Sequence, residues 1–335
     1  MSTGEYLFMS TCLPWQIELW QRVMASRNRG RMPHAILLTG VQGIGKRYFA
    51  QMLVRSLLCR LPSASGLACG QCRDCRLLSI GYHPALFDCQ PSETNAVIKI
   101  DQIRELAEFC THTSSNNGIR IGLIAPAEQM NQQAANALLK TLEEPPPGVV
   151  LLLLSSQPRQ LLATLRSRCQ MLKLTRPPQA LALQWLLDQG FTENTEVLLA
   201  LAGGAPLQAQ QLAQQQALSN QRLLFEIYLA VIEQRLSEVA AAEQWLRQDI
   251  NQSLVWLLGW HMDLARLKLG EQTELNHLDL TQELRNLADV VSVAECFRRY
   301  HALLQIRQQL KIQRNAPMLM EAFFSSCRTK PRRLT

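Results

Sequence analysis

The sequence predicts an α/β region followed by an all-α region, and three observations support this prediction. Short apolar runs alternate with helical patterns over about the first half of the chain. A glycine-rich segment follows the first apolar run and opens the first helix of that region. Convincing strand patterns disappear after Arg176-Pro177-Pro178, and helical periodicity takes over. Strand–helix alternation of this kind is typical of a parallel sheet with helices on both faces.

Composition sets the outer limits of this prediction. The chain has 335 residues, of which 47% are hydrophobic and 18% charged, so it can bury a core and form two or three domains. Its net charge of +7 is compatible with a polyanionic partner. The longest apolar run, 149–154, is far shorter than the roughly 20 residues that span a bilayer. No signal-peptide pattern opens the chain, so we expect a cytoplasmic protein without a membrane segment.

The predicted sheet has four strands. The first two are short, largely apolar runs, as expected for buried parallel strands covered on two sides. The four strands are 35–39, 119–124, 149–154 and 170–174.

Helical periodicity connects these strands and then dominates the rest of the chain. Helices are predicted over 46–58, 100–110 and 131–144, the last of them stopped by three prolines. A short helical unit follows to about 215, and a longer helical segment runs to about 326. The stripe of apolar residues expected to pack there comprises Leu223, Leu224, Ile227, Tyr228, Val231 and Ile232. The basic residues 329–335 are expected to form a frayed tail.

The glycine-rich segment has the context of a phosphate-binding loop. Gly40, Gly43 and Gly45 allow backbone N–H groups to curl around a phosphate, and Lys46 would reach its outer oxygens. The next position should carry a hydroxyl for magnesium, but it holds Arg47, which cannot bind a cation. The segment can therefore hold a nucleotide or form a tight turn without a ligand, and the sequence leaves both open.

The second predicted strand also lacks the groups that ATP hydrolysis requires. A phosphate-loop ATPase needs a carboxylate at the end of a neighbouring strand to hold magnesium. Here the strand ends in Ala125 and Pro126, while Glu128 is interpreted as a charge at the start of the following helix. The sequence therefore predicts a chain that does not hydrolyse ATP.

Four of the ten cysteines are clustered. Cys59, Cys69, Cys72 and Cys75 have the spacing C-x9-C-x2-C-x2-C, and four thiolates can enclose a structural Zn²⁺ without an open position. An iron–sulfur cluster, a redox pair and free thiols are the alternatives. The remaining cysteines are expected to be small packing residues: Cys12, Cys89, Cys110, Cys169, Cys296 and Cys327.

Several segments together resemble the AAA+ clamp-loader subunits of bacterial DNA polymerase III. The matching segments cover about residues 14–210 and include 34–38, the cysteine cluster, His83-Pro84, 98–104, 131–146 and 161–169. The C-terminal third matches only in being helical.

Within this family, the resemblance implies a subunit that does not hydrolyse ATP. The hydrolysing gamma/tau type keeps an intact phosphate loop, an Asp-Glu pair after the second strand and a sensor arginine. Arg47, Ala125-Pro126 and Leu207 occupy those positions here. The other type retains an arginine finger, which falls on Arg168 and would act on ATP bound by a neighbour. The bland interpretation of Arg168 is a surface ion pair.

The resemblance also implies an architecture and partners. We expect a Rossmann-like base at 1–171 with a zinc module at 59–75, a helical lid at 172–214 and an oligomerising helical collar at 215–335. The chain would join gamma/tau and delta in a heteropentamer that loads the β sliding clamp, contacted mainly through delta, onto primer-template DNA. Ser155 matches the sensor-1 region or simply caps a strand. Lys140, Glu143 and Glu144 are either solvated or contact other subunits.

Three alternatives come from other functional classes. An active gamma/tau-like ATPase is disfavoured by the missing carboxylates. A AAA+ regulator or helicase loader is disfavoured by the motifs at 131–146 and 161–169. A nucleic-acid-binding zinc protein is permitted by the net charge, but a cysteine cluster inside an α/β region favours a structural role.

Overall fold

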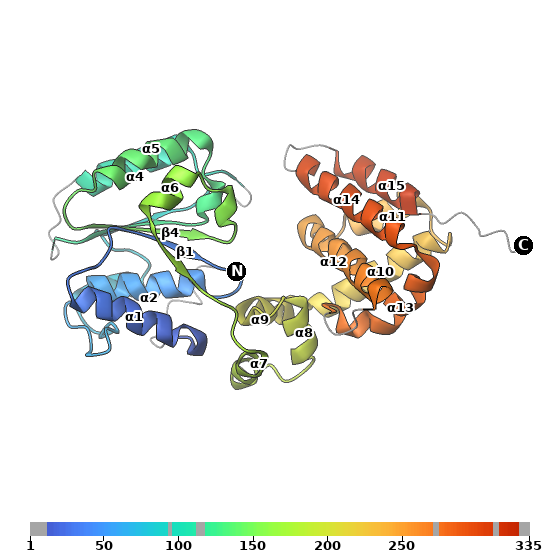
Figure 1. Cartoon of the computed structure of the whole chain (residues 1–335), viewed down its shortest axis with the longest axis horizontal. Helices are drawn as coiled ribbons and strands as arrows, with labels where there is room; N and C mark the ends of the chain where they lie inside the picture. The colour runs from blue at the N-terminus through green and yellow to red at the C-terminus, as the bar shows by residue number, and fades with distance from the viewer. Residues whose placement is uncertain (1–11, 93–95, 112–117, 271–274, 311–314, 328–335) are drawn as a thin grey trace, which may run out of the picture. The chain divides into compact units, whose positions relative to one another are not determined.

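A five-stranded parallel sheet forms the centre of the N-terminal unit (Figure 1). Its strand order is β2-β3-β4-β1-β5, and every neighbouring pair is parallel. The strands are β1 (Ala35–Thr39), β2 (Leu86–Cys89), β3 (Arg120–Ile124), β4 (Val149–Ser155) and β5 (Gln170–Lys173). The computed structural model describes residues 12–92, 96–111, 118–270, 275–310 and 315–327. The basic tail at 329–335 lies outside these ranges.

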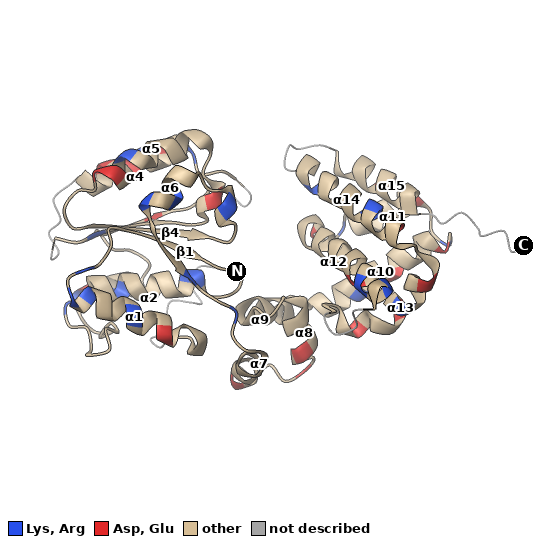
Figure 2. Cartoon of the chain, viewed as in Figure 1, with Lys and Arg blue, Asp and Glu red and all other residues tan. Residues whose placement is uncertain are grey.

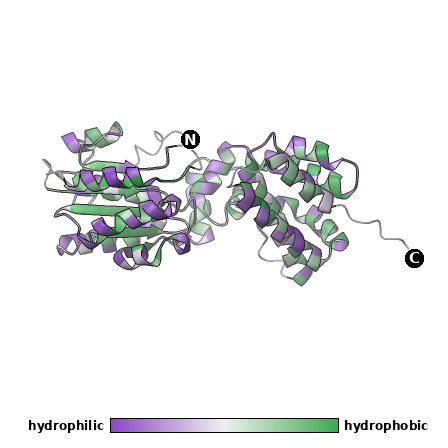
Figure 3. Cartoon of the chain, turned by 90° about the horizontal axis from the view of Figure 1, so that it is seen from above, coloured by the Kyte–Doolittle hydropathy of each residue, from purple (hydrophilic) through white to green (hydrophobic). Residues whose placement is uncertain are grey.

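Helices cover both faces of this sheet, as Figure 1 shows. Helices α4 (Ile100–Thr111), α5 (Gln132–Glu143) and α6 (Ala163–Arg168) lie on one side. On the other side lie α1 (Ile17–Asn28) and α2 (Lys46–Leu58). The strands appear as a hydrophobic layer in Figure 3, and all residues of β1 and β4 are buried. The sheet is therefore the core of this unit, in agreement with the prediction from the uninterrupted apolar runs.

The C-terminal unit is entirely helical in its described residues. The chain divides into two compact units, Met1–Leu181 and Ala182–Thr335. Helix α7 (Gln179–Asp188) crosses this boundary. The helices that follow are α8 (Thr195–Leu201), α9 (Pro206–Gln214), α10 (Ala217–Ile232), α11 (Glu238–Trp245), α12 (Ile250–Leu269), α13 (Thr281–Val290), α14 (Val293–Leu310) and α15 (Ala316–Cys327). The further division into lid and collar stays a prediction.

Aromatic residues and a buried polar chain hold the C-terminal unit together. The rings of Phe225 and Trp260 pack edge to face with centroids 4.9 Å apart. Tyr228 on α10 and His261 Nε2 on α12 lie 3.0 Å apart, and Arg299 on α14 donates to the Tyr228 hydroxyl over 3.3 Å. Arg299 also donates to the carbonyl of Cys327 at the end of α15. Four helices therefore share one network of buried hydrogen bonds.

Several sequence predictions need correction at the level of single elements. Helix α1 and strand β2 were not predicted. Leu223, assigned to the packed stripe, is 47% exposed, whereas its five companions are buried. Among the scattered cysteines, Cys12 and Cys169 are only half-buried. The other four are buried packing residues: Cys89, Cys110, Cys296 and Cys327.

The distribution of charged residues and the hydropathy of the helices complete the description of the fold. Lys and Arg residues are interspersed with Asp and Glu over both units (Figure 2). Among the described helices, none is long and apolar enough to cross a membrane.

Candidate functional site: phosphate loop, exposed arginine and cysteine cluster

The glycine loop connects the carboxyl end of β1 to the start of α2, where parallel sheets bind their ligands. Gly43 and Gly45 adopt φ values of +72° and +92°, which residues other than glycine rarely adopt. A Cβ atom at Gly40 would lie 2.7 Å from the carbonyl oxygen of Leu174. The glycines are thus required by backbone conformation and close approach.

Lys46 lies inside this loop. Its Nζ donates to the carbonyls of Gly40 and Val41, both at 2.9 Å, and to the hydroxyl of Ser156 at 2.8 Å. Burial lowers the pKa of Lys46 to about 8, and the nearby Glu128 carboxylate opposes this shift. The ammonium is therefore still charged at neutral pH. Ser156, which contacts Lys46, directly follows β4. Ser155, the last residue of β4, accepts a hydrogen bond from Gln157 N through its Oγ at the end of the strand.

Glu128 lies in the same place, which the sequence patterns did not indicate. It sits in the short 3₁₀ turn Ala127–Gln129 after β3, and its Oε1 accepts from Ser156 N over 2.9 Å. Glu128 thus lies in the first turn of a short helix, as predicted, and its carboxylate also acts electrostatically on Lys46. The adjacency of β3 and β4 was the available signal, because the carboxyl ends of neighbouring parallel strands meet at one edge.

Arg47 follows Lys46 where the phosphate-loop pattern has a hydroxyl. The Nη2 of Arg47 lies 2.5 Å from Asp88 Oδ2 on β2, so this arginine forms an ion pair where the phosphate-loop pattern has a hydroxyl. Burial raises the pKa of Asp88, and Arg47 and Gln90 offset only part of that rise. Ala125 continues β3 through a backbone hydrogen bond to Cys89, and neither Ala125 nor Pro126 offers a side-chain oxygen.

Two residues that precede α1 donate hydrogen bonds to the glycine loop. Trp15 Nε1 donates to the carbonyl of Ile44 over 3.0 Å. The buried amide of Gln16 donates to Ile44 and Gly45 over 3.1 and 3.0 Å. No sequence pattern indicated these contacts, because they join segments almost 30 residues apart. They fix the position of the carbonyls at the start of α2.

Arg168 is the last residue of α6, and its side chain is 36% exposed. Its Nη2 lies 2.5 Å from Glu143 Oε1 at the end of α5, and its Nη1 donates to Thr164 O over 3.1 Å. The guanidinium is therefore held on two sides but remains open to solvent. The sequence did not decide whether Glu143 is solvated or contacts another subunit. In this structure its carboxylate forms an ion pair with Arg168.

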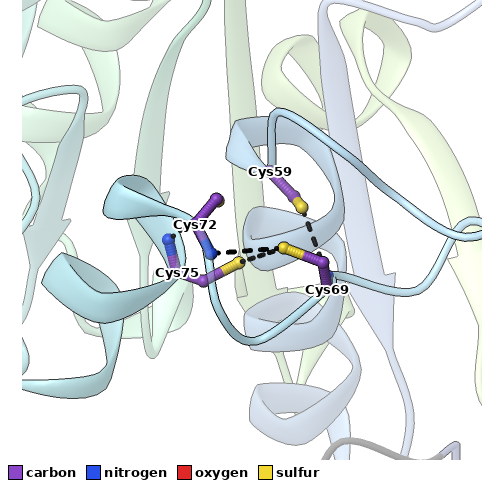
Figure 4. A group of neighbouring side chains, drawn as sticks. All are labelled: Cys59, Cys69, Cys72 and Cys75. Carbon is purple, nitrogen blue, oxygen red and sulfur yellow. Dashed lines mark hydrogen bonds between the residues drawn. The ribbon is translucent and has the colours of Figure 1, made fainter.

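The four clustered cysteines converge from three segments (Figure 4). Cys59 caps the end of α2, Cys69 lies in the following loop, and Cys72 and Cys75 begin α3 (Arg73–Ser79). Their sulfur atoms all lie within 4.8 Å of one another, and Cys69 and Cys75 are 3.9 Å apart. A tetrahedral site with Zn–S bonds of about 2.3 Å has sulfur atoms about 3.8 Å apart, so the donor set fits zinc.

Backbone and buried polar groups support this cluster. N–H groups of Gln71 and Cys72 lower the pKa of Cys69 to about 6 and thus favour its thiolate. Behind the cluster, buried Asp74 pairs with Arg60 at 2.6 Å and with His83 Nε2 at 3.2 Å. Because Ala85 N donates to His83 Nδ1, the histidine proton resides on Nε2 and points to Asp74. The predicted motif His83-Pro84 therefore anchors α3.

Comparisons with known proteins identify relatives of this chain. Residues 15–178 match a family model described as DNA polymerase III, delta subunit, and residues 207–323 match its C-terminal counterpart. The chain is 37% identical to DNA polymerase III subunit delta' of Pseudomonas aeruginosa, over 94% of this chain and 96% of that protein. It is 28% identical to the Haemophilus influenzae protein of the same name, over 90% and 92%. A gamma subunit-related protein from Thermotoga maritima aligns with a TM-score of 0.47 and 16% identity, covering 93% of this chain and 98% of that structure.

The parallel sheet, the glycine loop after β1 and the helical C-terminal unit together have the fold of a AAA+ module. Within that class, the chain belongs to the family of delta-prime subunits of DNA polymerase III.

Proposed function

We propose that this chain is a clamp-loader subunit that does not hydrolyse ATP and that offers Arg168 to ATP bound by a neighbouring gamma/tau subunit. The observation that carries the proposal is the contrast between its two candidate sites. The phosphate loop has Arg47 paired with Asp88 in place of a magnesium-binding hydroxyl. Arg168, in contrast, is partly open to solvent, and its planar guanidinium can contact phosphate oxygens at two points.

The position of Arg168 supports a role in trans. An arginine finger must present its guanidinium outside its own subunit, and Glu143 and Thr164 restrict the orientation of this one. An exposed ion pair contributes only about 0–1 kcal/mol to stability, so the pair costs little to rearrange around a phosphate. An arginine finger accelerates phosphoryl transfer by about 10³–10⁵-fold, so a small rearrangement is readily offset.

The proposed partners follow from the family. The chain would assemble with gamma/tau and delta subunits, and the assembly would place the β clamp, held mainly by delta, on primer-template DNA. The four cysteines would hold one structural Zn²⁺, which closes the segment between α2 and α3. An active gamma/tau-like ATPase is the competing function, and it requires a magnesium site that Ala125 and Pro126 do not provide.

The test uses an assembly reconstituted with gamma/tau and delta. We expect Arg168→Ala to reduce DNA-stimulated ATP turnover and clamp loading at least tenfold while the assembly still forms. Arg159→Ala is the matched control, because Arg159 is also exposed and also lies between β4 and β5 in the sequence. Normal turnover with Arg168→Ala would rule out the proposed role.

A further inference from the structure

Helix α3 has two faces, and only one of them is used by the cysteine cluster. Asp74, Cys75 and Leu78 are buried on the inner face. The outer face carries Arg73, Arg76, Leu77 and Ile80, which follow the i, i+3, i+4, i+7 spacing of one helical stripe. Together with Gln71 these residues line a cavity of about 430 Å³.

The chain segment that carries this cavity exposes several large apolar side chains. Ile80 is 74% exposed, and Leu61 and Tyr82, in the same segment, are 72% and 64% exposed. Single exposed apolar side chains are common in proteins, but these three belong to one short module that flanks the cysteine cluster. Such a concentration is typical of an interaction surface.

The charges beside the cavity are unpaired. Within the described residues, the guanidinium groups of Arg73 and Arg76 make no ion pair and no hydrogen bond. Arg60, in the same module, shows the contrast, because it pairs with Asp74 at 2.6 Å. The outer face of α3 thus offers two cations next to an apolar depression.

We propose that this face of α3 is a docking surface for a short acidic segment of another protein that carries a large apolar side chain. Charge complementarity selects an acidic occupant, and the cavity volume suits one or two large side chains. Arginines beside an apolar pocket are typical of binding hot spots. A nucleic acid is less suitable, because its backbone requires a track of cations and its bases require stacking platforms, while Leu77 and Ile80 line this cavity.

Contacts on its inner face fix the position of α3. The cysteines on its inner face and the Asp74–His83 contact hold the helix in place before any partner arrives. A rigid surface lowers the entropic cost of binding a flexible segment. This inference does not depend on the nucleotide loop or on Arg168.

The test measures binding of a short fluorescein-labelled peptide, in which Asp and Glu flank Leu and Phe, to the full zinc-loaded chain by fluorescence anisotropy. A peptide with Ser in place of Leu and Phe, and a labelled single-stranded DNA, are the comparison probes. We expect the apolar acidic peptide to bind more tightly than the Ser peptide by about tenfold. Equal affinity for the two peptides would overturn the proposal.

Matched variants locate the binding. We expect the double substitution Arg73→Glu with Arg76→Glu to weaken peptide binding at least tenfold. Ile80→Ser should weaken peptide binding about fivefold. Arg29→Glu with Arg31→Glu changes the net charge equally at another exposed place, and Leu269→Ser removes a similarly exposed apolar residue, so both should bind as the parent does. Zinc content of each variant reports folding of the module. The proposal fails if the control variants weaken peptide binding as much as the α3 variants do. It also fails if the α3 variants reduce DNA binding and leave peptide binding unchanged.

Discussion

Hydrogen bonds hold the Lys46 side chain inside the loop that follows β1. Its ammonium is satisfied by two loop carbonyls and Ser156, and it remains beside Glu128. The position therefore still carries the cation of a phosphate loop. Next to it, Arg47 forms an ion pair with Asp88 at the position where the phosphate-loop pattern has a hydroxyl.

The Lys46 amine is expected to titrate with a midpoint of about 8. The folded-state pKa lies below the ordinary value of about 10.4, so the unfolded chain binds more protons between these values and stability rises with pH across that window. NMR of ¹³C-methylated lysines measures the midpoint, and Lys46→Arg identifies the signal by its loss. A midpoint near 10.4 would show that the side chain is not buried as described.

Backbone geometry at Gly148 leaves no room for a larger residue. Its φ is +76°, and a Cβ atom there would lie 1.8 Å from the carbonyl oxygen of Gly118. We expect Gly148→Ala to reduce the free energy of unfolding by about 3 kcal/mol, from left-handed strain and from displacement of backbone. Gly30→Ala is the control, because Gly30 has φ +66° with no atom within 4 Å of a Cβ. It should cost only about 1 kcal/mol in urea unfolding; an equal loss for both variants would contradict this account.

At the scale of elements, the cysteine cluster joins α2 to α3. We expect one zinc ion per chain and complete loss of zinc from Cys72→Ser, measured by metal analysis of the purified protein. Chelation should lower the melting temperature of the N-terminal unit. Cys169→Ser is the control, because Cys169 lies outside the cluster, and it should retain zinc. Iron in the purified protein, or full zinc retention by Cys72→Ser, would refute the assignment.

The polar network of α10, α12, α14 and α15 predicts a pH dependence of the C-terminal unit. Burial lowers the pKa of His261 to about 4, so the neutral ring is the folded form. Since the unfolded ring titrates near 6.5, stability is fully present above that pH and is lost as pH falls toward 4. The loss is on the order of 3 kcal/mol.

Unfolding curves of two variants test this dependence. His261→Gln should flatten the change of stability between pH 6.5 and 4. His301→Gln, which alters an exposed histidine on α14, should keep the slope of the parent chain. Identical slopes for the parent and His261→Gln would show that His261 does not titrate in this window.

The elements differ in how far sequence predicted them. Strands such as β4, with seven buried residues, and helix α5, closed by three prolines, were confirmed because their patterns are long and uninterrupted. Strand β2 has only four residues and includes the ion-paired Asp88, so its pattern was too short and too polar to identify. Helix α1 was missed although it buries Trp20, because its polar face is as prominent as its apolar face.

The site shows the same limit. Motif spacing predicted the glycines, Lys46 and the four cysteines, since those residues are close in sequence and are brought together by local structure. The contacts of Gln16, Glu128 and Ser156 with the loop join distant segments, and sequence patterns carry no register between them. Whether Arg168 is free or paired could not be decided either, because Glu143 is on another helix.

At the scale of the whole molecule, the two compact units divide the proposed tasks. The N-terminal unit carries both the altered phosphate loop and Arg168, whereas the second unit is the helical part that contains the family match at residues 207–323. If the chain acts in the proposed assembly, its net charge of +7 would favour association of that assembly with DNA. Function on this view belongs to the assembly and not to the isolated chain.

The most direct test of the central claim is ATP turnover by one reconstituted clamp loader carrying either of two substitutions in this chain. We expect Lys46→Ala to leave DNA-stimulated turnover within about twofold of the parent assembly. Arg168→Ala should reduce it at least tenfold, because the neighbour's ATP loses its arginine. Turnover that is abolished by Lys46→Ala and retained by Arg168→Ala would show that this chain consumes ATP itself, which is the opposite of what we propose.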